Sequence, residues 1–579
     1  MRGKHDIFTA KMFRRMVVPS LCASFGLAFS DMADALVVGW RMGETGLAAI
    51  GMTLPLFMAI NLFMHGFGIG GSVRFAQLLG EGRREEAVRS FHQVLQLALA
   101  VGCLLALSVE LFTGAALRLL GAAESGGELY RQTAAYVRVI AAGIPVFFLN
   151  YILNYYLRCD GQQRRAVAGF LTGTVTDIGL NLLLVLVLDM GTAGAALATL
   201  AGSAVAVAVY LPGLMGGRGA LCLRRVRPSW REGLSCFRTG VSSSVQYVYQ
   251  LVFLLIATRT LLGVSGETGV AVFDMVQNAS YLILYLYDAS AKALQPLAGT
   301  FYGEKNQGAM ERSLVLALFW GLGWGGAAAG LLALFPRAVC AAFGLTEAAT
   351  LSVGAQALRL YCLSSLFGGT SILLEAYFQS VEREREAFVL ATLRGCAVLL
   401  PVTLLLALLR PEGLWWVFPV TELLSLVLFL LWRWLHPVRR AAFPQERILL
   451  RQIQSRTEDL GGLTAETEAF CQQWGATPRQ IYLVNLVIEE LAVAIISKAF
   501  STRRDGSIQI TLIACEEGGF QLHLRDNAAG FNPFSLETGK AGGDGDFDMD
   551  AMGMMVVKKQ AKAFFYRQYQ GFNTLVVSI

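Results

Sequence analysis

Two aspartates lie near the end of the first long apolar run of the sequence. Asp31 and Asp34 are three residues apart in a stretch that otherwise suits lipid. An ionisable side chain inside a membrane span costs a few kcal/mol or more, so such residues face protein or water and mark a path for ions or substrates. Because removal from water disfavours a charged carboxylate, such a residue can bind and release a proton. We therefore expect Asp34 and Asp31 to bind a coupling ion, with a helix cap or a bond to a backbone carbonyl as the structural alternative.

Later in the chain, polar side chains recur at steps of three or four residues, which places them on one face of one helix. They are Asp274, Asn278, Tyr281, Tyr285, Asp288, Lys292 and Gln295. A polar stripe on a membrane helix must contact protein or water, so we expect it to line a central cavity and to contact substrate. Asp288 and Lys292 could instead neutralise each other at their spacing of four.

Gln250 and Glu375 are further candidates for the wall of this cavity. Each stands in an apolar segment, where a polar side chain needs a partner. A hydrogen bond to a neighbouring helix would explain either residue equally well.

The composition identifies the elements that must hold these side chains. Hydrophobic residues make up 55% of the chain and charged residues only 16%, which is typical of a polytopic membrane protein. Apolar runs of about 20 residues, each long enough to cross the bilayer core, number about twelve. The net charge of +6 needs no nucleic-acid partner, because arginines in the connecting loops explain it. Ten cysteines stand singly, so we expect neither a disulfide framework nor a metal site.

The arginines and lysines also predict the orientation. Cytoplasmic loops collect positive charge, and alternate loops of this chain do so, most of all the run from Arg218 to Arg238 with its six arginines. The basic N-terminus precedes a full-length span, so it does not read as a cleaved signal. We expect a multi-pass protein of the cell membrane with both termini in the cytoplasm.

A repeat divides the membrane part into two halves. Gly43-Glu44-Thr45-Gly46 recurs as Gly266-Glu267-Thr268-Gly269, an offset of 223 residues (266 − 43). Later matches, such as Tyr156 with Tyr377, have an offset of 221 (377 − 156). Two six-helix halves in the same orientation should place the substrate path at their interface, near the middle of the membrane.

The order of motifs resembles the multidrug and toxic compound extrusion (MATE) family over roughly residues 10–436. The motifs are Pro19 in the first span, Asp34 followed by Gly39, Gly43-x-x-Gly46, Gly80-Glu-Gly82 and Gly191-Thr-Ala-Gly194. The resemblance implies two six-helix bundles that alternate access and export amphipathic or cationic compounds in exchange for H⁺ or Na⁺. It also implies that Asp34 is the family's carboxylate for cation coupling.

A second coupling position follows from the same resemblance. The fifth helix of related proteins carries an Asn and, four residues later, an Asp; this chain has Asp177 and Asn181, in reversed order but still on one helix face. The repeat equivalents of Asp34 and Asp177 in the second half, Ala257 and Val398, are apolar. Ion coupling is therefore expected in the first half.

Beyond the last span the composition changes to that of a soluble domain. We expect a helix over 449–473, a second over 478–500, and strands over 507–515, 520–525, 564–569 and 574–579. The chain is thus predicted to be an all-α membrane protein of about twelve helices, with a cytoplasmic α+β tail. The expected domains are 1–215 and 239–437 in the membrane, a basic linker 216–238, and the tail 438–579.

The tail resembles the ATP-binding domain of histidine kinases and anti-sigma-factor kinases. Glu490 falls on the acidic helix, Asp526 on the adenine-binding loop and Gly553 on the glycine-rich lid, but Ala494 replaces the Asn that holds magnesium in that family. Without this oxygen, Mg²⁺ loses a protein ligand. ATP hydrolysis or kinase activity is therefore not expected, and we predict a degenerate regulatory or partner-binding module.

These observations favour a cation-coupled exporter, not an enzyme. The expected partners are a small organic cation, membrane lipid and a cytoplasmic regulatory protein at the tail; no cofactor is expected beyond H⁺ or Na⁺. Two alternatives stay open. One is a flippase for lipid-linked glycans, which needs a cationic cavity, and the other is a membrane sensor whose tail is a nucleotide-dependent switch.

Overall fold

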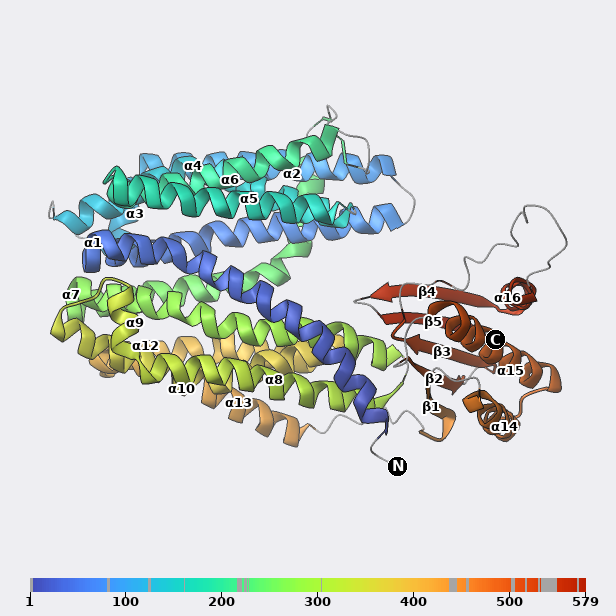
Figure 1. Ribbon diagram of the computed structural model, residues 1–579. Helices are drawn as coiled ribbons and strands as arrows, with labels where there is room; N and C mark the ends of the chain where they lie inside the picture. Colours follow the sequence, from blue (N-terminus) through green and yellow to red (C-terminus); the bar gives the residue numbers. More distant parts are fainter. Residues whose placement is uncertain are drawn as a thin grey trace.

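The chain forms two helical bundles with a smaller α+β domain at one end (Figure 1). The computed structural model describes residues 4–80, 84–122, 127–160, 162–215, 221–222, 226–227, 229–303, 305–436, 445–454, 458–500, 506–515, 518–528, 532, 549–569 and 572–579. The N-terminus lies at the same end as the tail. The prediction of a helical membrane protein with an α+β tail is confirmed.

Each half begins with one very long helix that is bent at a glycine. α1 (Lys4–Gly80) bends at Gly43, where φ is 59° and ψ −136°, and α7 (Trp230–Gly303) bends at Gly266, where φ is 61° and ψ −147°. Only glycine adopts this backbone conformation without strain. The repeated Gly-Glu-Thr-Gly motif therefore makes the same turn twice, and each bent helix supplies two spans without an intervening loop.

The remaining helices complete the halves. In the first half they are α2 (Arg84–Leu111), α3 (Thr113–Leu120), α4 (Glu128–Cys159), α5 (Gln163–Asn181), the π-helical turn η1 (Leu182–Val187) and α6 (Gly191–Met215). In the second half they are α8 (Gln307–Leu334), α9 (Pro336–Ala342), α10 (Ala348–Ser380), α11 (Glu384–Thr392), the π-helical turn η2 (Leu393–Ala397), α12 (Leu399–Leu409), the 3₁₀ turn η3 (Pro411–Trp416) and α13 (Val417–Leu435).

Within the described residues, eleven helices are long and apolar enough to cross a membrane. Ten of them lie in the two bundles, and the bends at Gly43 and Gly266 divide two of these, which gives twelve spans. The eleventh, Pro478–Ser497, belongs to the tail, where its apolar face is buried in the tail's own core.

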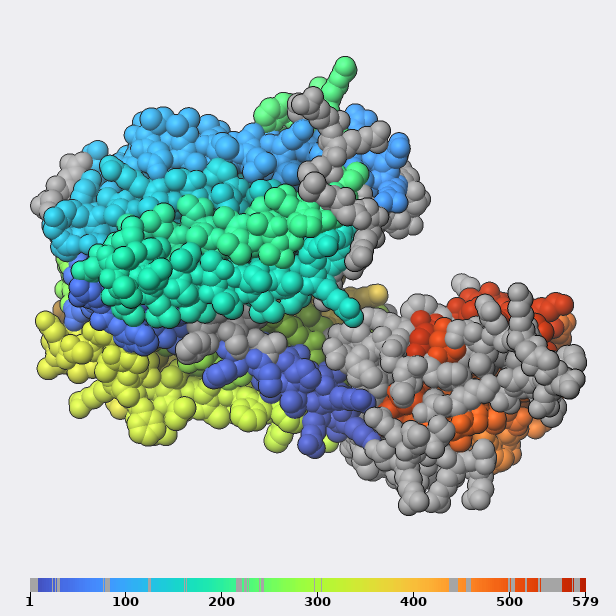
Figure 2. All heavy atoms as spheres, turned by 45° about the horizontal axis from the view of Figure 1, so that its top comes forward, coloured from blue at the N-terminus to red at the C-terminus, as the bar shows by residue number. Residues whose placement is uncertain are grey.

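The first segment of α1 crosses from one half to the other. Met12, Phe13 and Met16 pack in the core of the second half, whereas Val37 and Val38 pack in the core of the first. Figure 2 shows this segment, in dark blue, lying over the yellow-green helices of the second half. The helix that carries Asp34 therefore contacts both halves.

The tail is an antiparallel sheet with the strand order β1-β2-β3-β5-β4. Its elements are the 3₁₀ turn η4 (Gln445–Arg447), β1 (Ile448–Gln454), α14 (Glu458–Gln473), α15 (Pro478–Ala494), the π-helical turn η5 (Ile495–Ala499), β2 (Ser507–Ala514), β3 (Phe520–Asp526), α16 (Met549–Gln560), β4 (Ala563–Tyr569) and β5 (Phe572–Ser578). The helices lie on the side of the sheet away from the bundles (Figure 1).

One expected element of the tail was wrong. The sequence predicted a single helix over 449–473, but its first part is β1, and only Glu458–Gln473 is helical. β1 pairs with β2 along its whole length, from Ile448 opposite Ile513 to Gln454 opposite Ser507. The strand forms because it completes the sheet edge, a tertiary contact that overrides local preference.

Candidate functional site

A cavity of about 400 Å³ lies at the interface of the two halves and contains three carboxylates. Asp34 and Asp177 come from α1 and α5 of the first half, and Asp274 comes from α7 of the second. Aromatic side chains form much of the remaining wall, among them Phe57, Phe147, Phe170, Tyr136 and Tyr151. The cavity therefore combines an acidic centre with an apolar, aromatic lining.

Asp34 is held by two neighbours from other helices. The Asn181 side-chain amide donates to Oδ1 of Asp34, and Thr199 Oγ1 donates to Oδ2 at 3.2 Å. Asn181 is completely buried, and its own Oδ1 has no hydrogen-bond partner within the described part of the chain. The same holds for Oδ1 of Asp177. Both oxygens can ligate a cation, and the carboxylate of Asp177 can also bind a proton.

Close helix packing brings Asp177 to this position. A Cβ on Gly202 of α6 would lie 2.7 Å from the carbonyl oxygen of Gly173 on α5 and 2.9 Å from the Cβ of Asp177. Only glycine leaves room for this approach, as in other small-residue contacts between membrane helices. The π-helical turn η1 begins directly after Asn181, and such turns often occur at functional sites.

The other site residues predicted from the sequence do not all lie in this cavity. Asn278 and Tyr281 line the 400 Å³ cavity, and Tyr285 stacks on Tyr281 with ring centroids 5.9 Å apart. Asp288 pairs with Lys292 at 2.5 Å, on a partly exposed part of the helix. The side chain of Asp31 lies outside the described residues.

Gln250 and Glu375 line a second cavity of about 640 Å³, which lies within the second half. Its wall also contains an ion pair that the sequence analysis did not single out. Arg394 Nε and Nη2 donate to the two carboxylate oxygens of Glu422, each at 2.8 Å. A Cβ on Gly368 would lie 3.0 Å from the carboxyl carbon of Glu422, so this glycine leaves space for the pair.

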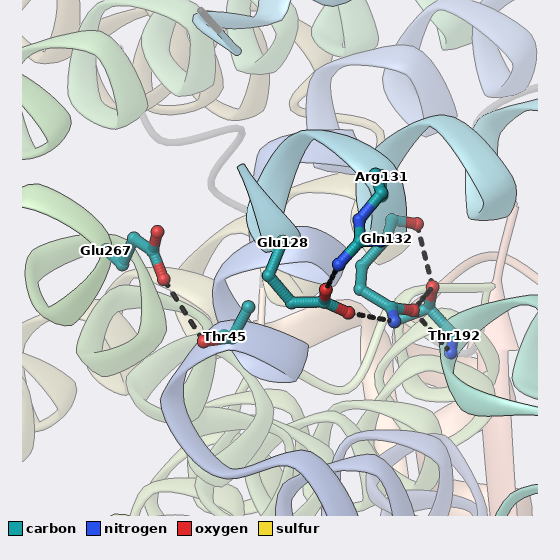
Figure 3. Close-up of polar contacts among 6 residues, drawn as sticks. All are labelled: Thr45, Glu128, Arg131, Gln132, Thr192 and Glu267. Atoms are coloured by element: carbon teal, nitrogen blue, oxygen red, sulfur yellow. Dashed lines mark hydrogen bonds and ion pairs between the residues drawn. The ribbon is translucent and has the colours of Figure 1, made fainter. Parts of the chain in front are cut away.

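The two halves are joined at the end of the molecule opposite the tail by reciprocal hydrogen bonds. Thr45 Oγ1 donates to Glu267 at 3.1 Å, and Thr268 Oγ1 donates to Glu44 at 2.8 Å. Figure 3 shows the first of these bonds between the two halves. Each partner is the repeat equivalent of the other, so the Gly-Glu-Thr-Gly motifs form a pseudo-symmetric lock. Glu44 also accepts a hydrogen bond from Thr350.

Further contacts hold the two halves together at this end of the molecule. Trp40 Nε1 donates to the carbonyl oxygen of Ala342 at 2.6 Å, and the backbones of Gly39 and Gly344 meet so closely that a Cβ on Gly344 would lie 1.9 Å from the Gly39 oxygen. Beside the lock, Gln132 ties the start of α4 to Thr192 of α6 (Figure 3).

We expect loss of the lock to loosen this end of the molecule. Hydrogen bonds at such half-exposed positions contribute about 0.5–1.5 kcal/mol each, so Glu267→Ala should raise the opening equilibrium by about 2- to 10-fold. Glu44→Ala removes two bonds and should have the larger effect. Hydrogen exchange of the amides around Gly43 and Gly266 measures this, with the exposed Glu412→Ala as control. Equal exchange in all three variants would contradict the role of the lock.

The tail has a buried carboxylate at the position expected for an adenine-binding residue. Asp526, at the end of β3, is fully buried; its Oδ1 accepts hydrogen bonds from the Ala528 amide at 2.9 Å and from Asn573 Nδ2 at 2.8 Å. Its Oδ2 has no partner within the described residues. Burial raises the pKa of Asp526 to about 6, although the two hydrogen bonds act in the opposite direction.

The other expected tail positions lie on helices. Glu490 is on α15, and Ala494 ends this helix as a buried residue. Gly553 lies inside α16, so that part of the expected lid motif is helical. Thr477 caps the start of α15. Its Oγ1 accepts a hydrogen bond from the backbone amide of Gln480, and its own backbone amide donates to the Gln480 side chain. Residues 533–548, which precede α16, are outside the described residues.

Asp526→Asn should stabilise the tail at neutral pH. Because the folded-state pKa of Asp526 is raised from 3.8 to about 6, ionisation costs the folded state free energy above pH 6, about 1–3 kcal/mol. As pH falls from 7 to 4 the wild type should gain stability and the difference should vanish. Hydrogen exchange of β3 in the full chain at pH 5 and pH 8 tests this; a variant less stable at pH 8 would contradict it.

Arg525, which precedes Asp526 on β3, contacts the membrane part of the chain. Arg525 lies over the ring of Phe301, near the end of α7, with its guanidinium carbon 4.9 Å from the ring centroid. Both side chains are buried, with exposed fractions of 2% and 0%. Burial and Arg525 together lower the pKa of the adjacent His523 to about 4, so this histidine is neutral at physiological pH. β3 thus links Asp526 to the second half.

Sequence reasoning missed three parts of these sites: Thr199 as a partner of Asp34, the ion pair Arg394–Glu422, and the position of Asp274 in the same cavity as Asp34. Thr199 lies five residues after the motif Gly191-Thr-Ala-Gly194, and nothing in the sequence singled out its hydroxyl. Arg394 and Glu422 stand in apolar spans, where each charge on its own was a signal for a partner.

Comparisons with known proteins agree with this architecture. The family model MatE matches residues 19–183 and 239–404, one stretch in each half, and a model described as histidine kinase-like ATPase domain matches residues 453–579. Among curated proteins, "Probable multidrug resistance protein YoeA" of Bacillus subtilis is 24% identical over 426 residues, covering 71% of this chain and 90% of that protein. "Multidrug export protein MepA" of Staphylococcus saprophyticus is 23% identical and covers 72% and 92%.

Solved structures show the same fold. An inward-facing conformation of a multidrug resistance MATE family transporter has a TM-score of 0.63 at 23% identity, covering 70% of this chain and 94% of that one. The MATE multidrug transporter DinF-BH has a TM-score of 0.59 at 24% identity, covering 73% and 95%. The chain therefore belongs to the MatE family of multi-pass membrane transporters and carries a C-terminal histidine kinase-like ATPase domain.

Proposed function

We propose that the chain is a secondary active exporter that moves amphipathic or cationic organic compounds out of the cell in exchange for H⁺ or Na⁺. The carrying observation is the 400 Å³ cavity at the interface of the halves, with carboxylates on both sides and an aromatic wall. Carboxylates bind the coupling ion, and aromatic faces favour organic cations. The relatives named for multidrug export support this class of substrate.

The position of Asp34 supports coupling in the first half. Its two oxygens accept hydrogen bonds from Asn181 and Thr199, and Asp177 lines the same cavity. A cation or proton can join this cluster because the buried oxygens of Asp177 and Asn181 have no partner within the described residues. Filling and emptying this site favour different arrangements of the halves, which couples ion flow to substrate export.

The cavity chemistry favours this function over a flippase for lipid-linked glycans. Phosphate groups of such lipids need lysine or arginine, whereas the described lining of the interface cavity has three aspartates and neither basic residue. The arginine of the second cavity, Arg394, is already paired with Glu422.

For the tail we propose a regulatory or partner-binding role without ATP hydrolysis. Ala494 replaces the magnesium-binding Asn, yet the tail retains the buried carboxylate of Asp526, one oxygen of which has no partner among the described residues. Arg525, one residue away, contacts Phe301 of α7. A partner that binds the tail at Asp526 can therefore influence the second half through β3. The positions of the N-terminus and the tail at one end support cytoplasmic termini.

Accumulation of a fluorescent organic cation in cells tests the transport proposal. Cells that express the chain should accumulate less dye than cells with an empty vector. A proton uncoupler, or removal of sodium from the medium, should abolish the difference and identify the coupling ion. Equal accumulation in both strains, with the protein shown to be in the membrane, would reject an exporter of organic cations.

A further inference from the structure

Asp274 differs from the other two carboxylates of the interface cavity because it belongs to the second half. It lies on α7, eight residues after the bend at Gly266, and yet it lines the cavity together with Asp34 and Asp177. Gly51 of α1 allows this approach, since a Cβ there would lie 3.0 Å from the Cβ of Asp274. The acidic centre is thus assembled from both halves.

Only one of the two carboxylate oxygens of Asp274 accepts a hydrogen bond within the described residues. Its exposed fraction is 0%, and Asn278 Nδ2 donates to its Oδ2 at 3.1 Å. Its Oδ1 has no hydrogen-bond partner within the described residues. A buried carboxylate oxygen without a partner is costly. Oδ1 of Asp274 is therefore available to a ligand that enters the cavity.

The surroundings of Asp274 suit an organic cation better than a bare ion. Gln277, Asn278 and Tyr281 of the same helix line the cavity, and so do Phe57 and Tyr136 of the first half. Aromatic faces and an amide near one carboxylate match a positively charged group on an apolar body. The hydrogen-bonded cluster of Asp34, Asn181 and Thr199 is compact and suits a small ion instead.

We propose that Asp274 binds the positively charged group of the substrate, while Asp34 and Asp177 bind the coupling ion. This inference rests on the proposed export function and divides its two ligands between the two halves. The substrate is then held on the second half and the ion on the first. A relative movement of the halves separates the two sites, so release of one ligand is linked to the position of the other.

Equilibrium binding to the purified full-length protein tests this assignment without any ion gradient. The probes are ethidium, a permanent cation, and Nile red, an uncharged dye of similar size. Asp274→Asn should raise the Kd of ethidium about 10-fold or more, as expected for loss of a charge-assisted contact of about 1.4 kcal/mol or more. The Kd of Nile red should change less than about twofold.

Two further variants separate a binding role from a structural one. Asp274→Glu retains the charge and should keep ethidium binding closer to the wild type than Asp274→Asn does. Glu311→Gln removes an exposed carboxylate of the second half, outside the cavity, and should bind both probes like the wild type. Unchanged ethidium binding in Asp274→Asn, equal weakening of both probes, or failure of Asp274→Glu to restore binding would each overturn the proposal.

Failure of the proposed role of Asp274 can be distinguished from failure of the proposed export function. Binding that follows the expected pattern, without uphill export by the wild type, would reject coupled transport and leave the role of Asp274 intact. If the wild type showed coupled export but bound ethidium and Nile red independently of the charge at Asp274, the export function would stand and the role of Asp274 would be rejected.

Discussion

Asp34→Asn should reduce uphill export by reconstituted protein to the level of empty liposomes. The asparagine oxygen can still accept the hydrogen bond from Asn181, and its amide group can donate to the Thr199 hydroxyl, so the local packing is retained. The variant lacks the carboxylate that binds H⁺ or Na⁺, and an ion can shift the equilibrium between two states only through a difference in affinity. Export measured with an imposed proton or sodium gradient would show this loss and identify the ion.

Two controls define this result. Asp189→Asn, which removes an exposed ion pair with Arg41, should transport like the wild type. Ethidium binding to Asp34→Asn should stay near the wild-type value, because the cation binds elsewhere in the cavity. Uphill export retained by Asp34→Asn would show that coupling depends on other residues.

Loss of one partner of the ion pair Arg394–Glu422 should be the most damaging change to stability in the second half. The two side chains are mostly buried, with exposed fractions of 19% and 22%, and share two hydrogen bonds. Glu422→Gln leaves the guanidinium charge in the membrane part without its partner, which costs about 3–5 kcal/mol. Thermal unfolding of purified protein, followed by a thiol-reactive dye, should show a clear fall in Tm.

The paired replacement is the decisive control. Arg394→Met combined with Glu422→Leu removes both charges together, so it should be less destabilising than Glu422→Gln alone. The exchange Arg394→Glu with Glu422→Arg should also recover part of the loss. A double variant as unstable as the sum of the single variants would show that the pair has no special interaction.

The sequence was sufficient where one local signal determines the structure. Apolar runs predicted the spans, and the offset of 223 between the Gly-Glu-Thr-Gly motifs predicted two halves. The motif did not show that Glu44 would meet Thr268, because that contact depends on how the halves face each other. The strand β1 was assigned to a helix for the same reason, since only its pairing with β2 defines it.

The candidate site was predicted in its parts but not in its assembly. Asp34 was identified from its apolar neighbours, Asp177 from the family resemblance and Asn278 from the polar stripe on its helix. Periodicity placed Asp274 on a stripe of the second half but could not show that it shares a cavity with Asp34. The role of Gly202 was also out of reach, because close approach of two helices is a property of packing and not of either helix alone.

The first segment of α1 crosses between the halves and must bend when they move relative to each other. Met12 and Phe13 are anchored in one half and Val37 in the other, so a relative rotation of the halves has to bend the helix between them. Pro19 lies in this segment and removes one backbone hydrogen bond there, which lowers the bending stiffness. In the proposed movement of the halves, free energy stored by bending this helix in one direction would be released on return. A stiffer α1 would therefore alter the rates of both movements together.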